Sequence, residues 1–182
     1  SCKVKVNWIH SEEINETNVE EKLTGLSGVL VAPGFGDRGI EGKISTIKYV
    51  RENNIPFFGI CLGMQSAVIE YARNILGLKD ANSTEMNKNT SNPVIDIMEE
   101  QKEVIEKGGT MRLGSYDCSI SKESEAYNSY KNTNISERHR HRFEFNNKYK
   151  ADFKKYGLLS TGINTKNNLV EIVEIPTHPW FV

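Results

Sequence analysis

Apolar residues in the first half of the chain fall into short runs that alternate with amphipathic stretches. Residues 28–31 and 57–60 are apolar and β-prone, which predicts two buried strands. Residues 40–50 repeat isoleucine and valine at helical spacing, and residues 64–75 carry one apolar stripe at i, i+3, i+4, i+7, i+8 and i+11. Each of these two stretches predicts a helix, and Gly77 is a stop signal for the second.

The N-terminal residues suggest the same alternation of strand and helix. Residues 3–9 alternate between polar and apolar side chains, which predicts a strand, and residues 11–22 have a helix-like composition. Strands that alternate with helices indicate a parallel sheet covered by helices on both faces. We therefore expect an α/β protein.

The second half of the chain is patterned differently. Residues 81–107 are polar and weakly periodic, and we expect a loop or poorly ordered helix there, most of all over residues 99–107. The last third carries four strand-like runs separated by turns, which predicts additional strands of more antiparallel character. These four runs are residues 110–120, 142–145, 158–163 and 169–175.

Length and charge exclude several functional classes. A chain of 182 residues has the length of one domain, and a domain of that size buries roughly 70% of the surface that its unfolded chain exposes. The formal net charge of -1 provides no general basic field for nucleic acid or an anionic membrane. No apolar run approaches the roughly 18 residues of a membrane span, and we expect a soluble, cytoplasmic protein.

The cysteines give no sign of a structural cross-link. Cys2, Cys61 and Cys118 are odd in number, widely separated and without CxxC spacing. This pattern argues against a disulfide framework and against a zinc site built on thiolates. We expect free thiols and no metal site.

One of these cysteines lies in a motif that carries chemistry. Residues 59–63 read G-x-C-x-G, which matches a nucleophile elbow with a thiol in place of the hydroxyl. The preceding strand and following helix would expose Cys61 at the carboxyl edge of the sheet, at a helix N-terminus. There the helix dipole and free N–H groups can lower a cysteine pKa to roughly 3.5–7.5. The alternative is a buried structural cysteine.

A second glycine-rich stretch fits G-x-G-x-x-G over residues 34–39. A dinucleotide site would also need an acidic residue at the end of the next strand, but that strand ends in Cys61, and we reject the nucleotide interpretation. A loop at the carboxyl end of a neighbouring strand could instead direct N–H groups at an oxyanion beside the thiolate. An ordinary tight turn remains the alternative.

The densest positive cluster covers residues 137–142, where arginine and histidine alternate. On a strand, this alternation places the arginines on one face and the histidines on the other. The cluster could bind a phosphate, an RNA strand or a carboxylate, or form a charged strand face, and we do not expect nucleic acid as a partner. A thiolate nucleophile commonly works with a histidine, and position alone favours His178, which follows the strand-like run 169–175.

Six segments together resemble a known family. The stretches "GFGDRGIEGKI", "GICLGMQ", "ANSTEM", "GGTMRLG", "ERHRHRFE" and "HPWFV" occur in this order in the class I glutamine amidotransferase domain of CTP synthase. The cysteine elbow is shared by all class I glutamine amidotransferases, whereas "GGTMRLG" with "ERHRHRFE" is specific to the CTP synthase type. The resemblance covers essentially the whole chain, residues 1–182, as one amidotransferase domain.

The resemblance implies a flavodoxin-like α/β fold and a glutaminase activity. Cys61 would attack the side-chain amide of L-glutamine, form a γ-glutamyl thioester and release ammonia. Gly34 and Leu62 would supply the oxyanion hole, because Pro33 has no N–H. The substrate-binding positions implied by the resemblance are Gly34, Phe35, Leu62, Gln65, Glu85 and Arg142. A carboxylate and a guanidinium suit the ammonium and carboxylate groups of free glutamine.

The family also implies partners outside these residues. A synthase domain of the same chain would use ATP and magnesium to aminate UTP, GTP would act as activator, and the full-length protein would be a homotetramer. The amidotransferase domain itself implies no cofactor. The family's His-Pro-Glu element would follow "HPWFV", so His178 would be an upstream histidine and not the base, and we expect a domain truncated at both ends.

Two other functions remain open at this point. One is a cysteine hydrolase of the peptidase or γ-glutamyl hydrolase type on the same fold, which would cleave peptides or γ-glutamyl tails. The other is a catalytically incomplete fragment that binds glutamine without turning it over.

Overall fold

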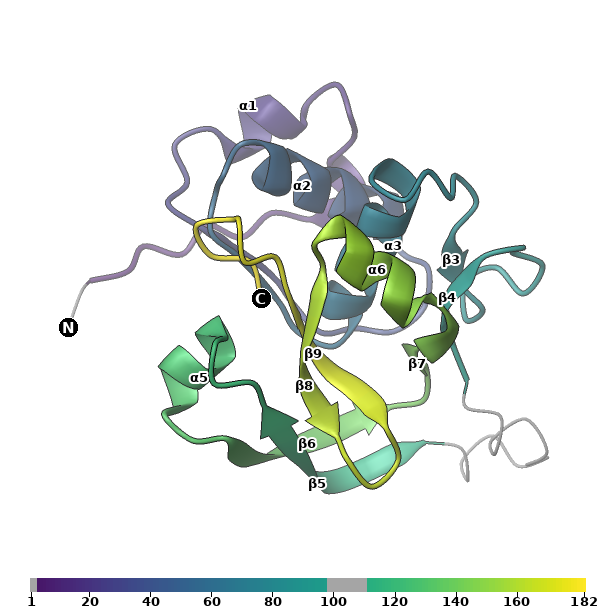
Figure 1. Cartoon of the computed structure of the whole chain (residues 1–182). Helices are drawn as coiled ribbons and strands as arrows, with labels where there is room; N and C mark the ends of the chain where they lie inside the picture. Colours follow the sequence, from purple (N-terminus) through teal and green to yellow (C-terminus); the bar gives the residue numbers. More distant parts are fainter. Residues whose placement is uncertain (1–2, 98–110) are drawn as a thin grey trace.

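The computed structural model describes residues 3–97 and 111–182, and its first half is built from strand–helix units (Figure 1). Strands β1 (Val29–Val31) and β2 (Phe57–Gly59) pair in parallel, with Val29 opposite Phe57 and Val31 opposite Gly59. Helices α2 (Ile40–Glu52) and α3 (Leu62–Asn74) follow these strands. The strands and helices predicted here are confirmed to within about two residues at each end.

Helices α2 and α3 pack against each other and close the core beside the sheet. Ile47, Val50, Val68 and Ile69 are completely or almost completely buried between them. Two charged side chains are also buried at this contact: Arg51 Nη2 lies 2.7 Å from Glu70 Oε1, and the exposed fraction of the Glu70 side chain is 0%. Apolar faces at helical spacing therefore fix the helices in place.

The N-terminal segment departs from the prediction. Residues 3–9 form no strand, and Val4, Val6 and Trp8 have exposed fractions of 73%, 62% and 89%. A strand forms only where its backbone groups find a hydrogen-bonding partner, and no described strand pairs with this segment. Figure 1 shows the segment running away from the body of the molecule.

The helix expected over residues 11–22 is also wrong as one element. It is divided into the 3₁₀ turn η1 (Ser11–Glu13) and the short helix α1 (Val19–Leu23). The Asn15 side chain explains the break, because its Oδ1 accepts hydrogen bonds from the backbone N–H groups of Thr17 and Asn18. Asparagine side chains that bond the local backbone in this way compete with the helix.

Part of the segment expected as loop is sheet. Strands β3 (Asn82–Ser83) and β4 (Pro93–Asp96) pair in parallel, and β4 pairs in antiparallel with β7 (Glu144–Phe145). Val94 and Ile95 are fully buried, so two apolar residues inside a polar stretch were enough to anchor a strand. The helical or loop expectation for residues 99–107 lies outside the described residues.

The last third forms an antiparallel sheet in the order β6-β5-β8-β9. Its strands are β5 (Arg112–Ile120), β6 (Asn134–His141), β8 (Leu159–Asn164) and β9 (Leu169–Glu174). The predicted runs 110–120, 158–163 and 169–175 correspond to β5, β8 and β9, but β6 was not among the predicted strands, and the run 142–145 contains β7 of the other sheet. The sequence did not predict the helical elements inserted between these strands. These are α5 (Glu125–Tyr130), η3 (Asn147–Tyr149) and α6 (Lys150–Tyr156).

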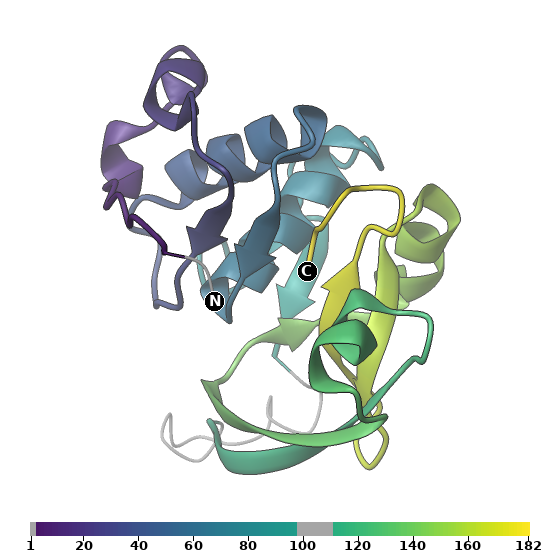
Figure 2. The same ribbon diagram turned by 90° about the vertical axis from the view of Figure 1, so that its left-hand side faces the viewer.

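The two halves meet around the C-terminal segment. Phe181 bridges to Phe57 in parallel, the Phe57 N–H donates to the Trp180 carbonyl at 2.8 Å, and the Gly59 N–H donates to the Val182 carbonyl at 2.9 Å. Figure 2 shows this segment between the strand–helix half and the curved antiparallel sheet. Residues 180–182 therefore extend the parallel pairing of β2 towards the edge at which β2 ends.

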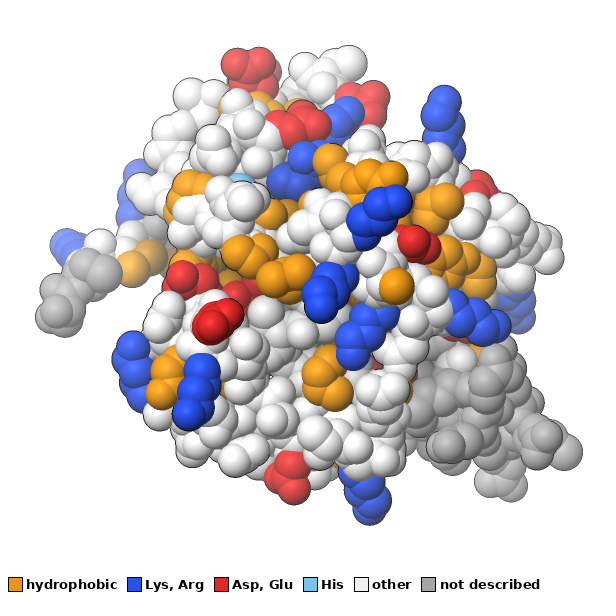
Figure 3. Space-filling view, viewed as in Figure 1, with side chains coloured by type: hydrophobic (Ala, Val, Ile, Leu, Met, Phe, Trp, Pro, Cys, Tyr) orange, Lys and Arg blue, Asp and Glu red, His pale blue; other side chains and the backbone are white. Residues whose placement is uncertain are grey.

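The surface carries charges of both signs. On the face shown in Figure 3, lysine and arginine side chains are interspersed with aspartate and glutamate and form no continuous basic area. Among the described residues, no helix is both long and apolar enough to cross a membrane.

Candidate active site

Cys61 lies at a sharp turn between β2 and α3. Its backbone dihedrals, φ 55° and ψ −104°, fall outside the regions that non-glycine residues ordinarily adopt. The flanking glycines permit the turn. A Cβ at Gly63 would press on the backbone and side chain of Val31, and a Cβ at Gly59 would come within 2.8 Å of the Gly63 carbonyl carbon. The G-x-C-x-G spacing thus reflects close backbone packing around a strained cysteine.

Two backbone N–H groups approach the Cys61 sulfur. Those of Leu62 and Gly34 hydrogen-bond to it, and both act to lower its pKa. Burial acts in the opposite direction and is the largest effect, and the carboxylates of Glu85 and Glu144 add to it, so the pKa of the thiol is raised. The expectation of a lowered pKa at this helix N-terminus is therefore wrong, and the thiol needs a base to become a nucleophile at neutral pH.

A small hollow surrounds the thiol and contains most of the residues singled out in the sequence. It is lined by Gly34, Phe35, Cys61, Gln65, Glu85, Met111, His141, Arg142 and Phe143. Leu62 contributes its N–H group, and its side chain is buried in the core. The structure therefore brings the seven predicted site residues together, although they come from four separate stretches of the chain.

Two polar contacts shape this hollow. The Gln65 side chain donates from Nε2 to the Phe143 carbonyl at 3.0 Å, which joins α3 to the segment after β6. Glu85 accepts a hydrogen bond from the Gly36 N–H at 3.1 Å, which ties the glycine-rich loop to the segment after β3. The sequence did not indicate Met111 or Phe143 as site residues, and only the motifs "GGTMRLG" and "ERHRHRFE" pointed near them. His141 belonged to the basic cluster over residues 137–142, but position alone favoured His178 over it.

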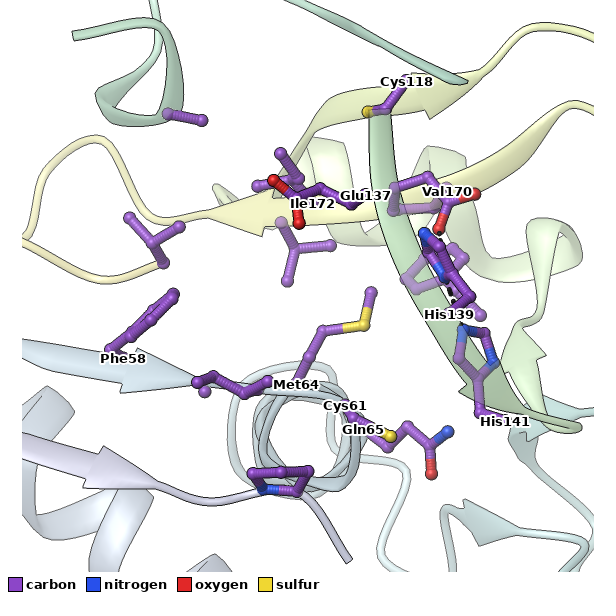
Figure 4. A pocket seen from close by; sticks show the side chains of 18 of the residues that line it. Phe58, Cys61, Met64, Gln65, Cys118, Glu137, His139, His141, Val170 and Ile172 are labelled. Carbon is purple, nitrogen blue, oxygen red and sulfur yellow. Dashed lines mark hydrogen bonds and ion pairs between the residues drawn. The ribbon is translucent and has the colours of Figure 1, made fainter. Parts of the chain in front are cut away.

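The hollow opens into a larger, mainly apolar pocket of about 770 Å³. That volume lies within the usual range of small-molecule sites. Figure 4 shows Met64 extending from α3 towards Val170 and Ile172 on β9, while His139 and His141 stand on β6 at the side of the pocket. Cys61 thus faces a cavity between the two halves of the protein.

The histidines fall into two groups. His178 is buried away from this pocket, with Nε2 3.2 Å from the Val50 carbonyl oxygen and Nδ1 accepting from the Trp180 N–H. Both ring nitrogens are engaged with backbone, so the choice of His178 by position alone is wrong. His139 and His141 line the pocket, and burial, the largest cause, lowers the pKa of each to about 4.

The alternation predicted for the basic cluster is confirmed on β6. Arg138 and Arg140 are exposed, whereas His139 and His141 are half-buried on the pocket side. The Arg140 guanidinium lies 6.0 Å from the centre of the Phe35 ring, at the limit of a cation–π contact.

A buried ionic network supports the side of the pocket on which His139 and His141 lie. The sequence did not reveal this network. Arg112 pairs with Glu144 at 3.1 Å and with Glu171 at 2.8 Å, and all three side chains are about 95% buried. Burial raises the pKa of Glu144 to about 8 despite the neighbouring guanidinium. Glu144 and Glu171 lie on different strands, so their approach depends on the sheet and not on any local motif.

Comparison with known proteins agrees with this geometry. The family model of class I glutamine amidotransferases matches residues 1–182. The CTP synthase of Cytophaga hutchinsonii is 62% identical over 181 residues, and that of Clostridium acetobutylicum is 57% identical over 182 residues. Each match covers 100% of this chain and 34% of the relative, so the chain spans about a third of the length of these relatives.

A solved structure agrees as well. The glutaminase domain of Trypanosoma brucei CTPS, with bound acivicin, superposes with a TM-score of 0.91 at 38% sequence identity. The match covers 99% of this chain and 71% of that one. This structural similarity confirms the predicted fold class. The chain therefore belongs to the class I glutamine amidotransferases, as a glutaminase domain of the CTP synthase type.

Proposed function

We propose that the chain hydrolyses the side-chain amide of L-glutamine and passes the ammonia to a synthase domain. The observation that carries the proposal is the Cys61 elbow, with the N–H groups of Gly34 and Leu62 at the sulfur and a pocket in front of it. Donors placed in this way can bind the oxyanion that forms when a thiolate attacks an amide carbon.

The reaction proceeds in two halves. The thiol transfers its proton to a base, and Sγ bonds to the amide carbon while the carbonyl electrons move onto oxygen. Collapse of this tetrahedral species re-forms the carbonyl and breaks the C–N bond. Ammonia leaves with the proton returned by the base, and Cys61 remains as a γ-glutamyl thioester. Water then hydrolyses the thioester to glutamate, and the thiol is restored without any cofactor.

The residues around the hollow suit the two charged ends of glutamine. Glu85 provides a carboxylate for the ammonium group, and Arg142 provides a guanidinium for the α-carboxylate. The carboxamide would lie between Cys61 and Gln65, with Phe35 against the substrate's aliphatic part. These roles follow from charge and from position around one thiol.

The raised pKa of Cys61 makes the base essential. We propose that the base lies on residues that follow Val182, in the His-Pro-Glu element that the family resemblance implies. The parallel pairing of residues 180–182 with β2 supports this placement, because a continued strand would pass the carboxyl end of β2, where Cys61 begins the turn. In that case residues 1–182 are part of a longer amidotransferase domain.

In the full-length protein, the ammonia would be consumed by a synthase domain that activates UTP with ATP and magnesium. GTP would act as activator, the assembly would be a homotetramer, and the protein would be cytoplasmic. These properties rest on the family and on the full-length relatives that are CTP synthases. An apolar pocket in front of Cys61 is compatible with release of a small neutral product such as ammonia.

The test is glutamine hydrolysis by the full-length protein with Cys61→Ser, compared with Cys118→Ser as the matched control. We expect Cys61→Ser to abolish glutamate release and CTP formation from glutamine, while CTP formation from added ammonia persists. Cys118→Ser should retain both activities. Unchanged glutaminase activity in Cys61→Ser would refute the mechanism.

A covalent probe separates catalysis from binding. A diazo-ketone amino acid that mimics glutamine should add its mass to Cys61, and excess glutamine should prevent the labelling. Cleavage of γ-glutamyl peptides in preference to glutamine would favour a peptidase-like hydrolase. Glutamine protection without turnover in the full-length protein would indicate a binding module.

A further inference from the structure

Three donor groups converge on the pocket wall beside the thiol. His139 and His141 are two residues apart on β6 and therefore project to the same face of the sheet, as Figure 4 shows. His139 Nδ1 lies 2.8 Å from His141 Nε2 and 3.5 Å from Glu171 Oε2 on β9. One potential ligand atom from each residue falls within 4.8 Å of the other two.

These distances are close to those around a tetrahedral metal ion. With Zn–N bonds of 2.0–2.1 Å, two ligands on one zinc ion are about 3.3 Å apart. The separation between His139 and Glu171 already matches that value, and the two imidazole nitrogens would have to separate by only about 0.5 Å. Two imidazoles and one carboxylate are a ligand set typical of zinc sites that keep one position open.

The neighbours of His141 orient it for metal binding. Its Nδ1 lies 3.2 Å from the Phe143 carbonyl oxygen and 3.3 Å from Glu144 Oε1. A proton on Nδ1 satisfies either acceptor and leaves the Nε2 lone pair directed at the cluster, which is the arrangement found around metal-binding histidines.

The nearby positive charge of Arg112 has to be accommodated. Arg112 Nη2 donates to Glu171 Oε1 at 2.8 Å, whereas Arg112 Nη1 donates to Glu171 Oε2 over a longer distance, 3.4 Å, so Oε2 is the oxygen available to an ion. Glu144 Oε1 also pairs with Arg112 Nη1, at 3.1 Å, so this carboxyl group helps to balance the guanidinium beside an entering cation.

We propose that His139, His141 and Glu171 form a binding site for a divalent transition-metal ion of the Zn²⁺ type. The absence of suitable thiol spacing led the sequence to predict no metal site, but this ligand set contains no thiol. His141 also lines the small hollow around Cys61, so a bound ion would restrict the approach to the thiol. Metal binding itself does not depend on the proposed glutaminase function.

The test measures Zn²⁺ binding to the full chain by competition with a chromophoric chelator, and repeats it with Co²⁺ to obtain a ligand-field spectrum. We expect one ion per chain, bound at least tenfold more weakly after His139→Ala, His141→Ala or Glu171→Gln. His10→Ala removes an exposed histidine and serves as the matched control, with unchanged affinity. Cys61→Ser should bind the ion as tightly as the unaltered chain.

The Co²⁺ spectrum keeps the test decisive if a variant fails to fold. A tetrahedral spectrum without thiolate-to-cobalt charge transfer supports the site in the unaltered chain. Thiolate charge transfer, affinity that is lost in Cys61→Ser but kept in His139→Ala, or no binding in competition with the chelator would each overturn the proposal. Zn²⁺ should also slow alkylation of Cys61, and His139→Ala should remove that effect.

Discussion

Gly63→Ala is the sharpest test of how the cysteine elbow is held. Gly63 is the second residue of α3, where helix propensity alone would make alanine more stable by up to about 1 kcal/mol. The added Cβ, however, would overlap the Val31 carbonyl oxygen and lie 3.1 Å from its carbonyl carbon and 3.2 Å from its Cβ. Helix propensity and packing therefore predict changes of opposite sign in the free energy of unfolding.

The structure sets the size of the packing effect. Carbon atoms prefer separations of about 3.5 Å or more, so the contact with the Val31 carbonyl carbon alone requires α3 to move from β1 by about 0.4 Å, and the overlap with the Val31 oxygen requires more. The same Val31 oxygen accepts a hydrogen bond from the Ile60 N–H at 3.0 Å, which the movement would weaken. Overpacking costs about 1–3 kcal/mol. After the helical gain is subtracted, we expect the free energy of unfolding to fall by about 1 kcal/mol and Tm to fall by roughly 2–4 °C.

The assay combines urea unfolding of the chain with the rate at which a diazo-ketone glutamine mimic labels Cys61. We expect at least a tenfold slower labelling, because the displaced turn separates the sulfur from the N–H groups of Gly34 and Leu62. Gly28→Ala is the matched control, since its Cβ would meet nothing nearer than 3.4 Å. A stabilised Gly63→Ala variant with normal labelling would show that the close contact with Val31 does not set the elbow.

Two further predictions concern buried titratable groups. Burial raises the pKa of Glu144 from 4.5 to about 8, so its stabilising effect is complete below about pH 4.5 and is lost as the pH rises through 8. The pKa of each pocket histidine is lowered from 6.5 to about 4, so the stability that these groups add with rising pH is complete only by about pH 7.5. In chelator-containing buffer the unfolding free energy should therefore decline from about pH 7.5 through pH 8, by at most about 1.4 kcal/mol per unit. Glu144→Gln should lack this decline, and the same slope in both proteins would contradict the assignment. His178→Phe should leave the buried Val50 carbonyl without its partner and lower the unfolding free energy by about 1–3 kcal/mol in urea titration, with unchanged Cys61 labelling. A loss of labelling as complete as in Cys61→Ser would instead give His178 a role at the thiol.

The strands and helices around the elbow could be predicted because their signals are local. Helix α3 carries its apolar stripe within 13 residues, and β2 precedes it directly. Strand β4 could not be predicted from periodicity, because two buried residues, Val94 and Ile95, carry its packing. Residues 3–9 have a strand pattern, yet a strand also needs a neighbour, and pattern alone cannot supply one.

The chemistry of the site was predictable to a similar degree. The G-x-C-x-G spacing indicated the turn at Cys61, but the direction of its pKa depended on burial and on Glu85 and Glu144, which are distant in sequence. His178 was favoured by its place after a strand, and the structure shows both of its nitrogens held by backbone. A single sequence does not reveal the burial of a side chain or its contacts with residues that are distant in sequence.

These long-range contacts explain how the site is divided between the two halves of the protein. Cys61 and the N–H groups of Leu62 and Gly34 come from the β2–α3 turn, from α3 and from the loop after β1, whereas Arg142 and Phe143 come from the segment between β6 and β7. Gln65 reaches across 78 positions of sequence to the Phe143 carbonyl, so the hollow exists only when the halves are docked. Burial raises the pKa of the Cys61 thiol, so the thiol stays protonated until a base is also in place. The same burial that forms the proposed glutamine site therefore disfavours the reactive thiolate of Cys61 before the site is complete.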